Sequence, residues 1–382
     1  MKTKTVIAHI ITKLELGGAQ VNTVYTSEHL DRKKFSVYLI AGHGGLLRPQ
    51  LPEVGHAIVA RRMVRPIRPL TDLRALAELI GVLKRIRPDI VHTHSAKAGI
   101  LGRLAARYCR VPVIVHSFHG FSFAPDQPFL KRTFYTMAEK LVSSLTTHFI
   151  FVAAADIRLA RGKKLIRENH SLIRSGFIMK PFLRKYANRA AIRKKHQLRN
   201  DQIVCGVIAP FKPQKGLFHL IDIAALVIRK QPRTVFFLAG DGELRPRIEA
   251  ELKRRGIEKN FRLPGFIQDL APVSAGFDIG VSCALWEGLP QSLVQLRLQK
   301  KPLVSSDIPG HRELIREGRN GFLVNVNDHR RFAARILELI ENPRLRKKMG
   351  SFSNEDFSEW NADMMVRRQE ELYQRLLQSA RR

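Results

Sequence analysis

The sequence predicts an α/β protein built from two domains, each with a parallel β-sheet covered by helices. Short apolar runs alternate with amphipathic stretches along the whole chain, which is typical of βαβ units. The 382 residues are more than one hydrophobic core usually organises, and the series of strands restarts after about residue 180. Hydrophobic residues make up 45% of the chain, a fraction that excludes a disordered protein.

The elements follow from this pattern in chain order. Residues 6–11 form the first expected strand. Apolar residues recur at helical spacing from Leu73 to Leu83, and Pro88 ends this helix before a strand over residues 89–91. The same arguments predict further strands over residues 35–41, 111–115, 149–152, 203–208, 234–238, 279–282 and 302–304.

We place the domain boundary near residue 180. Between residues 158 and 199 basic residues such as Arg193 crowd together and apolar residues are scarce, which predicts a surface passage between two domains. The predicted organisation is an N-terminal domain over residues 1–180, a C-terminal domain over residues 181–360, and a helix over residues 361–382 that packs back toward the N-terminal domain.

The charge is strongly basic and unevenly distributed. The chain has 66 Lys and Arg against 33 Asp and Glu, a formal net charge of +33. Residues 1–200 hold 36 and 11 of these, so a net charge of +25 lies in the first half. A surplus of this size predicts an anionic partner. No zinc-finger spacing, RNP-like motif or long basic tail is present, so we expect no nucleic acid among the partners.

The cysteines and the apolar runs predict the compartment. Three scattered cysteines are too few for a disulfide framework, which is typical of a reducing cytosol. The first apolar stretch contains His9 and lacks the length and cleavage site of a signal peptide. No apolar run approaches the roughly 20 residues of a membrane-spanning helix. We expect a cytoplasmic protein, with any membrane association peripheral.

A glycine pair, Gly17 and Gly18, separates the first strand from a helical stretch over residues 21–30. Glycines at such a turn let the backbone approach a ligand, and the helix N-terminus favours a phosphate. A plain tight turn is the simpler explanation of the pair alone. The G-x-G-x-x-G fingerprint is absent, which argues against a Rossmann oxidoreductase.

Histidines follow the strand over residues 89–91. It runs into His92, His94 and Ser95, ahead of a helix that carries Lys97, and open α/β sheets bind ligands at the carboxyl ends of their strands. A metal pair lacks a third ligand at a plausible spacing. The two alternatives that remain are a ligand-binding role and histidines that only hydrogen-bond at a strand end.

The next strand end repeats the theme with His116 and His119. We expect one of the two to donate a hydrogen bond to a substrate hydroxyl and the other to serve packing only.

In the second half, Lys212 and Lys215 follow the strand over residues 203–208, and an apolar helix begins at Leu217. The Lys215 ammonium and the free N–H groups of that helix can share one anion. The alternative is ordinary surface lysines.

Glu287 is the most informative residue of this half. It precedes Gly288, and Pro290 at the expected first helical turn puts it beside free backbone N–H groups. It can therefore accept hydrogen bonds from sugar hydroxyls while the amides hold a phosphate. The alternative is a solvated charge at the helix N-terminus.

Together these segments resemble the retaining family 4 glycosyltransferases, which have the GT-B fold of two facing Rossmann-like domains with the donor site in the interdomain cleft. The resemblance covers most of the chain, and its pieces occur in the family's order, at residues 17–20, 92–95, 97–103, 119–121, 215–216, 240–242, 265–266, 287–290 and 318–321.

The resemblance implies a transferase that moves a sugar from a UDP- or GDP-sugar to a saccharide or lipid-linked acceptor, in cell-surface polysaccharide or lipopolysaccharide synthesis. It implies that His119 faces the transferred sugar, Lys215 binds the diphosphate and Glu287 holds sugar hydroxyls, with no metal or other cofactor. It implies further donor contacts at Gly17, Gly18, Lys212, Gly240, Phe266, Ile267, Gly288, Leu289, Pro290 and Gln295, and acceptor-side contacts at His94, Ser95 and Lys97.

Two departures from the family keep other functions open. The family pairs two glutamates eight residues apart, and here the neutral Gln295 holds the second place, while Pro210 stands where an arginine is usual. One alternative is a catalytically weak or silent nucleotide-binding subunit. Another is a nucleotide-sugar epimerase of related architecture.

The basic first half suits a lipid-diphosphate acceptor at an anionic membrane surface, because each Lys or Arg near such a surface adds about 1 kcal/mol. We therefore expect peripheral binding to the inner face of the cytoplasmic membrane, weakened by salt.

Overall fold

The computed structural model describes residues 4–15, 17–45, 56–120, 129–183, 189–353 and 357–381. Contacts divide the chain into a first unit, Met1–Phe177 with Ser358–Arg382, and a second unit, Ile178–Phe357. The turn Ser358–Trp360 thus belongs to the first unit, whereas the sequence placed residues up to 360 in the second domain. No helix in the described part of the chain is long and apolar enough to cross a membrane.

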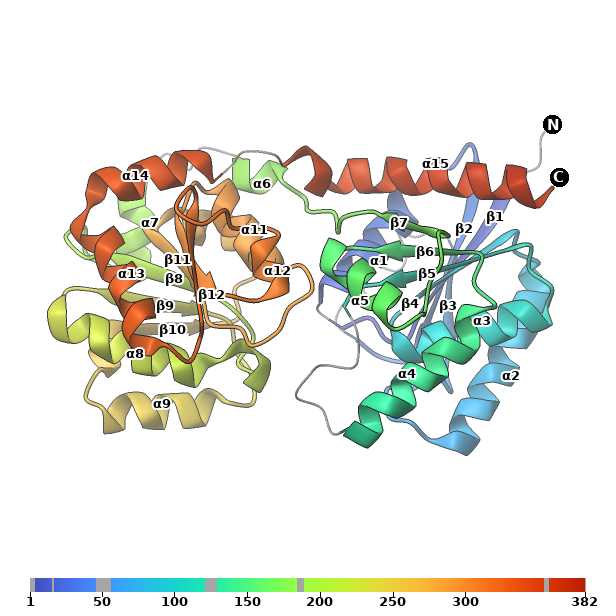
Figure 1. Ribbon diagram of the computed structural model, residues 1–382, viewed down its shortest axis with the longest axis horizontal. Helices are drawn as coiled ribbons and strands as arrows, with labels where there is room; N and C mark the ends of the chain where they lie inside the picture. The colour runs from blue at the N-terminus through green and yellow to red at the C-terminus, as the bar shows by residue number, and fades with distance from the viewer. Residues whose placement is uncertain are drawn as a thin grey trace. The chain divides into compact units, whose positions relative to one another are not determined.

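The first unit is a seven-stranded parallel sheet in the order β3-β2-β1-β4-β5-β6-β7, and Figure 1 shows its helices on both faces. Its strands are β1 (Thr5–Ile11), β2 (Phe35–Gly42), β3 (His56–Ala60), β4 (Ile90–His94), β5 (Val113–Phe118), β6 (His148–Phe151) and β7 (His170–Leu172). Its helices are α1 (Gly18–His29), α2 (Pro69–Ile86), α3 (Ala96–Tyr108), α4 (Phe129–Ser143), α5 (Ala154–Gly162) and α15 (Ala362–Ala380).

The second unit is a six-stranded parallel sheet in the order β10-β9-β8-β11-β12-β13. Its strands are β8 (Val204–Ile208), β9 (Val235–Ala239), β10 (Phe261–Gly265), β11 (Ile279–Ser282), β12 (Leu303–Ser306) and β13 (Gly321–Val324). Its helices are α6 (Lys180–Leu183), α7 (Arg189–Lys195), α8 (Leu217–Lys230), α9 (Arg245–Arg254), α10 (Leu270–Ala275), α11 (Gln291–Leu298), α12 (Pro309–Arg312), α13 (His329–Glu341) and α14 (Pro343–Phe352).

Helix α15 completes the core of the first unit. Its apolar residues Met365, Leu372, Tyr373 and Leu377 pack with strand residues of β1, β2, β4 and β5 on one face of the sheet. The other face packs against α2 and α3. Figure 1 shows α15, in red, lying along the first unit although it ends the chain. The sheet is therefore covered on both sides, as the buried, nearly continuous apolar strands require.

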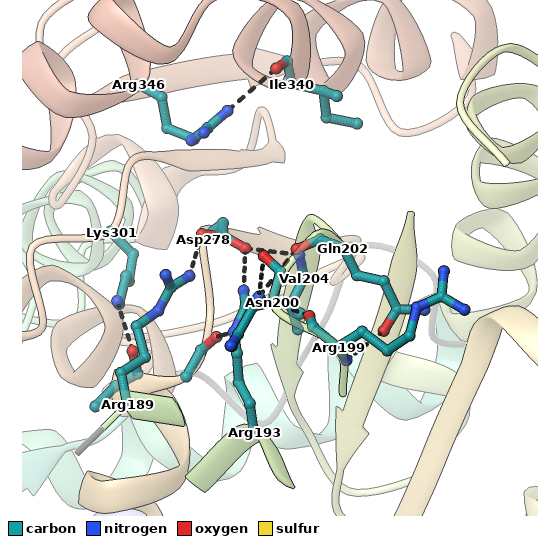
Figure 2. A network of polar contacts seen from close by, with 12 residues as sticks. Arg189, Arg193, Arg199, Asn200, Gln202, Val204, Asp278, Lys301, Ile340 and Arg346 are labelled. Atoms are coloured by element: carbon teal, nitrogen blue, oxygen red, sulfur yellow. Dashed lines mark hydrogen bonds and ion pairs between the residues drawn. The ribbon is translucent and has the colours of Figure 1, made fainter. Parts of the chain in front are cut away.

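The charge-rich segment expected to run over the surface is partly buried, which corrects that expectation. Arg193 on α7 is 1% exposed, and its guanidinium donates to Asp278 at 2.6 Å and to four backbone carbonyls, those of Arg199, Asn200, Gln202 and Gly276. Asp278 also pairs with Arg189 and accepts from the backbone N–H of Val204 (Figure 2). A guanidinium is tolerated in the interior here because each of its three nitrogens donates a hydrogen bond.

Most predicted elements are present, with differences at their ends. Helix α1 begins at Gly18 rather than residue 21, because Gly17 is extended and already stands at the N-cap. The strand expected over residues 111–115 is β5, which begins at Val113, after Pro112, and runs to Phe118. The short strands β3, β7 and β13 were not expected from the sequence. The apolar runs of β3 and β13 are only four and three residues long, and β7 has none.

Candidate functional site

Each sheet has one point where the strand order reverses direction, and such points are where open α/β sheets bind ligands. In the first unit it lies between β1 and β4, and in the second between β8 and β11. The segments that follow these four strands carry most of the residues singled out in the sequence. The topology thus gathers them at two sites, one in each unit.

In the second unit, the Lys215 ammonium and the Glu287 carboxylate form an ion pair with both side chains largely buried. Lys215 ends a single 3-10 turn after β8, and Glu287 lies in the loop between β11 and α11. The Gln214 side chain donates to the Trp286 carbonyl at 2.8 Å, and the Leu285 N–H donates to the Gln214 carbonyl at 2.8 Å. These two hydrogen bonds connect the loop that carries Lys215 to the loop that carries Glu287 and so hold the pair in place.

Gly216 explains why Lys215 can approach this loop. Its φ is +59°, and a Cβ there would lie 2.1 Å from the Cys283 carbonyl oxygen. Only glycine fits, because both the left-handed conformation and the close approach exclude a side chain. Gly216 is also the N-cap of α8, so the free N–H groups of that helix follow Lys215 directly.

His311 belongs to this site and was missed in the sequence. It is fully buried after β12, and its Nδ1 lies 2.7 Å from Ser305 Oγ and 2.8 Å from the Ser306 carbonyl. Burial lowers the pKa of His311 to about 4, and the Lys215 charge acts in the same direction. A neutral imidazole therefore lies close to Lys215. His311 could have been predicted from its position after the end of a strand, because the same rule identified Glu287.

The remaining donor-side candidates are spread along the same edge of the second sheet. Lys212 is exposed at the start of the 3-10 turn, and Gly240 has a φ of +150° where its backbone meets that of Gly265. The Phe266 side chain is exposed and Ile267 is half-buried. Pro290 is the N-cap of α11 rather than part of its first turn, and Gly288 and Leu289 precede it.

Gln295 lies on α11. Among the described residues no donor reaches its Oε1, although that atom is buried. An amide oxygen without a donor among the described residues thus stands where the resemblance implied a carboxylate.

In the first unit, Gly17 and Gly18 form the N-terminus of α1, and Ser95 forms that of α3. Ser95 Oγ lies 2.8 Å from Thr12 Oγ1, and Thr12 Oγ1 accepts from the Ala98 N–H at 3.1 Å. The end of β1 is therefore joined to the start of α3. Ser95 is part of this connection, which gives it a structural partner.

Lys97 has internal partners. Its ammonium lies 2.7 Å from Asp72 on α2 and also donates to the Pro66 carbonyl. The ammonium is mostly buried by these contacts. It ties α3 to α2, so an anionic ligand would have to compete with Asp72.

Three histidines are linked edge to edge at the switch point of the first sheet. His9 Nδ1 lies 3.1 Å from His94 Nε2, and His94 Nδ1 lies 3.2 Å from His119 Nε2. The parallel register places His9 beside His92 and Ile11 beside His94, which brings the rings together. Burial lowers the pKa of His9 to about 3 and of His119 to about 4. These rings are neutral at pH 7.

His92 stands beside this chain with partners of its own. Its Nδ1 lies 2.6 Å from the Tyr373 hydroxyl of α15, and its Nε2 lies 2.7 Å from Ser117 Oγ. One ring nitrogen from each of His9, His92 and His94 lies within 4.8 Å of the others. Of the six nitrogens, His9 Nε2 alone lacks a protein partner among the described residues, so ligation of an ion would require breaking hydrogen bonds.

His116 faces the opposite side of the sheet and serves packing. Its Nδ1 lies 2.8 Å from Thr93 Oγ1, and a Cβ at Gly99 would lie 2.6 Å from its ring. Beside it, Arg103 is fully buried and donates to Glu139 at 2.6 Å. Of the two expected alternatives, His119 is therefore the one left at the switch point. Phe121, the last residue of that predicted motif, lies outside the described residues.

Two parallel α/β units, each with its candidate residues at the switch point, have the architecture of the GT-B class of transferases. The comparison with solved structures supports this fold. The chain superposes on the crystal structure of Anabaena HepE in complex with UDP-glucose with a TM-score of 0.81 and 20% identity, over 97% of this chain and 99% of that one. For WaaG, a glycosyltransferase of lipopolysaccharide biosynthesis, the TM-score is 0.76 at 14% identity, over 96% and 99%.

The chain belongs to the glycosyltransferases: residues 17–176 match the glycosyl transferase 4-like domain and residues 188–356 match the glycosyl transferases group 1. It is 27% identical over 376 residues to the UDP-Gal:α-D-GlcNAc-diphosphoundecaprenol α-1,3-galactosyltransferase of Escherichia coli, covering 97% of both chains. It is 29% identical over 283 residues to putative glycosyltransferase EpsD of Bacillus subtilis (strain 168), covering 73% of this chain and 74% of EpsD. The expected fold class and enzyme class are confirmed, as is the place in polysaccharide biosynthesis.

Proposed function

We propose that this glycosyltransferase moves a hexose from a UDP-sugar to a sugar-diphosphate lipid, with retention and without a metal ion. The observation that carries the proposal is the Lys215–Glu287 pair at the switch point of the second sheet. The E. coli relative is named for a UDP-galactose donor and an acceptor on diphosphoundecaprenol, which supports this choice of substrates.

The pair explains how the site would handle a charged donor. Without a ligand, Lys215 and Glu287 neutralise each other in a largely buried position. A nucleotide sugar would supply a diphosphate for Lys215 and hydroxyls for Glu287, so each side chain would exchange its partner for a group on the same molecule. The exchange leaves neither charge buried and unpaired, which would otherwise be costly.

The mechanism follows from where charge develops. As the bond between sugar and diphosphate breaks, negative charge grows on the leaving phosphate, and a fixed ammonium stabilises that state more than the ground state. The free N–H groups at the start of α8 would add to this effect. In the first unit, the half-buried His119 would face the transferred sugar.

The test is initial rates with UDP-galactose and GlcNAc-diphosphoundecaprenol. Lys215→Ala should lower kcat by about 10²–10³, the cost of removing one preorganised electrostatic group. Glu287→Ala should raise KM for the donor as well. The matched control is Lys230→Ala, an exposed lysine at the end of α8, which should retain the native rate. Rates of both site variants within twofold of the native rate would refute the assigned roles.

The same assay separates the alternatives. An epimerase would convert the UDP-sugar when the acceptor is left out, whereas the transferase requires it. A silent subunit would bind UDP-sugar without turnover in either case. Addition of EDTA should leave the transfer rate unchanged, and loss of activity restored by a divalent cation would contradict the metal-free proposal.

We further propose that the protein binds peripherally to the inner face of the cytoplasmic membrane through the start of α2. Leu70 is 74% exposed and Leu73 is 63% exposed. Arg65, Arg68 and Arg74 flank them in the sequence and are exposed too. Apolar side chains beside cations suit an anionic membrane interface.

Sedimentation with vesicles of phosphatidylglycerol and phosphatidylcholine tests this proposal. Leu70→Ser with Leu73→Ser should reduce the bound fraction, and salt should reduce it further because it screens the arginines. Leu159→Ser, an exposed leucine on α5 of the same unit, is the control and should bind as the native chain does. Binding indifferent to lipid charge and to salt would exclude this surface.

A further inference from the structure

His311 lies at the same edge of the second sheet as the Lys215–Glu287 pair. Strands β8, β11 and β12 are neighbours in this sheet, and Lys215, Glu287 and His311 each follow one of them. The turn that carries His311 packs on the Glu287 loop, because a Cβ at Gly310 would lie 2.7 Å from the Glu287 carbonyl oxygen. The Lys215 charge contributes to the lowered pKa of His311. The imidazole is therefore within electrostatic reach of the ammonium.

The backbone decides which nitrogen of His311 has the hydrogen. A neutral imidazole has one donor nitrogen and one acceptor nitrogen. His311 Nδ1 lies 2.8 Å from the Ser306 carbonyl oxygen, which can only accept. Ser305 Oγ lies 2.7 Å from Nδ1 and can donate its own hydrogen to the Ser282 carbonyl at 3.3 Å. Nδ1 is therefore the donor, and Nε2 is the bare acceptor nitrogen.

His311 Nε2 is an acceptor without a donor. The residue is fully buried, and Nε2 has no hydrogen-bond partner among the residues that the structure describes. Because burial lowers the pKa of His311 to about 4, the ring is neutral at pH 7 and keeps this lone pair. A buried polar atom without a partner has lost its hydrogen bond to water with nothing in return. Such an atom calls for a donor that arrives when the site is occupied.

The Lys215 ammonium is the donor closest to hand. It has three hydrogens, and Glu287 is the one side chain that pairs with it in the described part of the protein. An ionised diphosphate has no hydrogen to donate, so it cannot pair with His311 Nε2 itself. Once a nucleotide sugar separates Lys215 from Glu287, the ammonium can donate to the diphosphate and to His311 together.

A neutral acceptor provides what a carboxylate cannot. A carboxylate paired with Lys215 cancels the positive charge that the leaving diphosphate requires, whereas an imidazole lone pair orients the ammonium and leaves its charge intact. Orientation matters because electrostatic stabilisation depends on a charge that is in place before the bond breaks.

We propose that His311 is a positioning residue, whose Nε2 accepts a hydrogen bond from the Lys215 ammonium when a nucleotide sugar releases Lys215 from Glu287. The binding of a diphosphate by Lys215 rests on the proposed function. The tautomer of His311 does not, because it follows from the contact with the Ser306 carbonyl.

The first experiment follows the His311 nitrogens without turnover. The full chain is labelled with ¹⁵N-histidine, and long-range ¹H–¹⁵N correlation spectra are recorded at pH 7 with and without UDP. His311→Asn or His311→Gln identifies the His311 signals by their loss. We expect Nδ1 to be protonated in both states and UDP to move the Nε2 signal to lower chemical shift, as a bare nitrogen does when it begins to accept.

The outcomes separate this proposal from the proposed function. Protonation at Nε2 in the free protein overturns the role of His311, and so does an Nε2 signal that stays in place when calorimetry shows UDP bound. In Lys215→Met at saturating UDP the Nε2 signal should not move, and a shift that persists there shows a donor other than Lys215. If UDP does not bind at all, the proposed function fails and the role of His311 fails with it.

A double-mutant cycle tests the link to Lys215 during turnover. His311→Asn keeps an N–H donor near the Ser306 carbonyl and removes the Nε2 acceptor, so kcat should fall about ten- to hundredfold, the worth of a hydrogen bond to a charged group. In a Lys215→Ala background the same substitution should lower kcat by less than about twofold. An equal loss in both backgrounds means that His311 serves packing only and overturns the proposal.

The matched control is a histidine of the same unit outside the site. His329 on α13 has its Nε2 2.9 Å from His219 Nδ1, so His329→Asn removes a ring that already has a partner. This variant should retain the native kcat and leave the response of the His311 signals to UDP unchanged.

Discussion

At the scale of single residues, Gln295 stands where the resemblance to the family implies a second donor-site carboxylate. Its Oε1 is buried on α11 without a donor among the described residues. We expect residue 295 to face the ribose of the donor, where a carboxylate would accept a stronger, charge-assisted hydrogen bond than an amide would. The same carboxylate would be unpaired in the free enzyme, so it would destabilise the resting state.

Gln295→Glu should therefore tighten the binding of UDP by about three- to tenfold, because a charge-assisted bond is about twice as strong as a neutral one. It should also lower the melting temperature of the free protein, because the new carboxylate is buried without a partner there. Isothermal titration calorimetry and thermal unfolding measure the two effects. Gln378→Glu, at an exposed position of α15 in the other unit, is the control and should change neither quantity. Unchanged UDP affinity would indicate that residue 295 does not face the donor and would favour the silent-subunit alternative.

The sequence predicted the position of a site residue when that residue directly follows a strand. Lys215 and Glu287 each follow a strand, so the switch-point rule was enough to bring them to one edge. His9 lies within β1, and its meeting with His94 depends on the register between two strands, which one sequence does not reveal. Arg193 was taken for a surface cation because its partner Asp278 lies far along the chain.

At the scale of elements, the Arg103–Glu139 pair joins α3 to α4. The Arg103 guanidinium is fully buried and also donates to the Gly99 carbonyl at 2.7 Å and to Thr146 Oγ1 at 3.3 Å. Replacing Glu139 by glutamine keeps the shape and removes the counter-charge. Breaking one side of a buried pair leaves a charge uncompensated in a dry interior.

Glu139→Gln should lower the free energy of unfolding of the first unit by about 3 kcal/mol. Urea unfolding in a Trp286→Phe background reports this unit, because Trp360 is then the single tryptophan. Glu168→Gln removes the carboxylate of an exposed pair with Arg161 and should cost less than about 0.5 kcal/mol. Equal effects of the two substitutions would show that burial of Arg103 does not set the cost.

The sequence predicted the long elements better than the short ones. Helices such as α8 can be recognised in the sequence, because their apolar residues lie on one face and a glycine precedes them. Strands β3 and β7 lie at the edges of the sheet and are only partly buried, and the apolar run is four residues long in β3 and absent in β7. Edge strands bury less surface, and their sequences are correspondingly less constrained.

At the scale of the whole molecule, buried neutral histidines make the first unit sensitive to acid. Burial lowers the pKa of His9 to about 3, of His119 to about 4, and those of His92, His94 and His116 well below the usual 6.5. In the unfolded chain the same groups take up protons below pH 6.5. The unfolded state therefore binds more protons between about pH 4 and 6.5, and stability falls as the pH is lowered through that range.

Lowering the pH from 7.5 to 5.5 should cost roughly 1.4 kcal/mol for each such histidine, so His9 and His119 together account for about 3 kcal/mol. In the second unit His311 is a comparable group, with a pKa lowered to about 4. The first unit should therefore unfold before the second on acidification. Trp360 and Trp286, one in each unit, report the two transitions when each is kept alone. Coincident transitions with no loss of stability at pH 5.5 would contradict this.

Helix α15 closes the core of the first unit from the far end of the chain, and this bears on how the protein is made. Synthesis proceeds from the N-terminus, so the ribosome has completed all of residues 178–357 before the residues that cover Ile7, Val37 and Ile90 emerge. Until then one apolar side of the nascent sheet stays open to solvent and to other chains. A stop codon or proteolytic cut before Ala362 thus damages the half of the protein that was translated first.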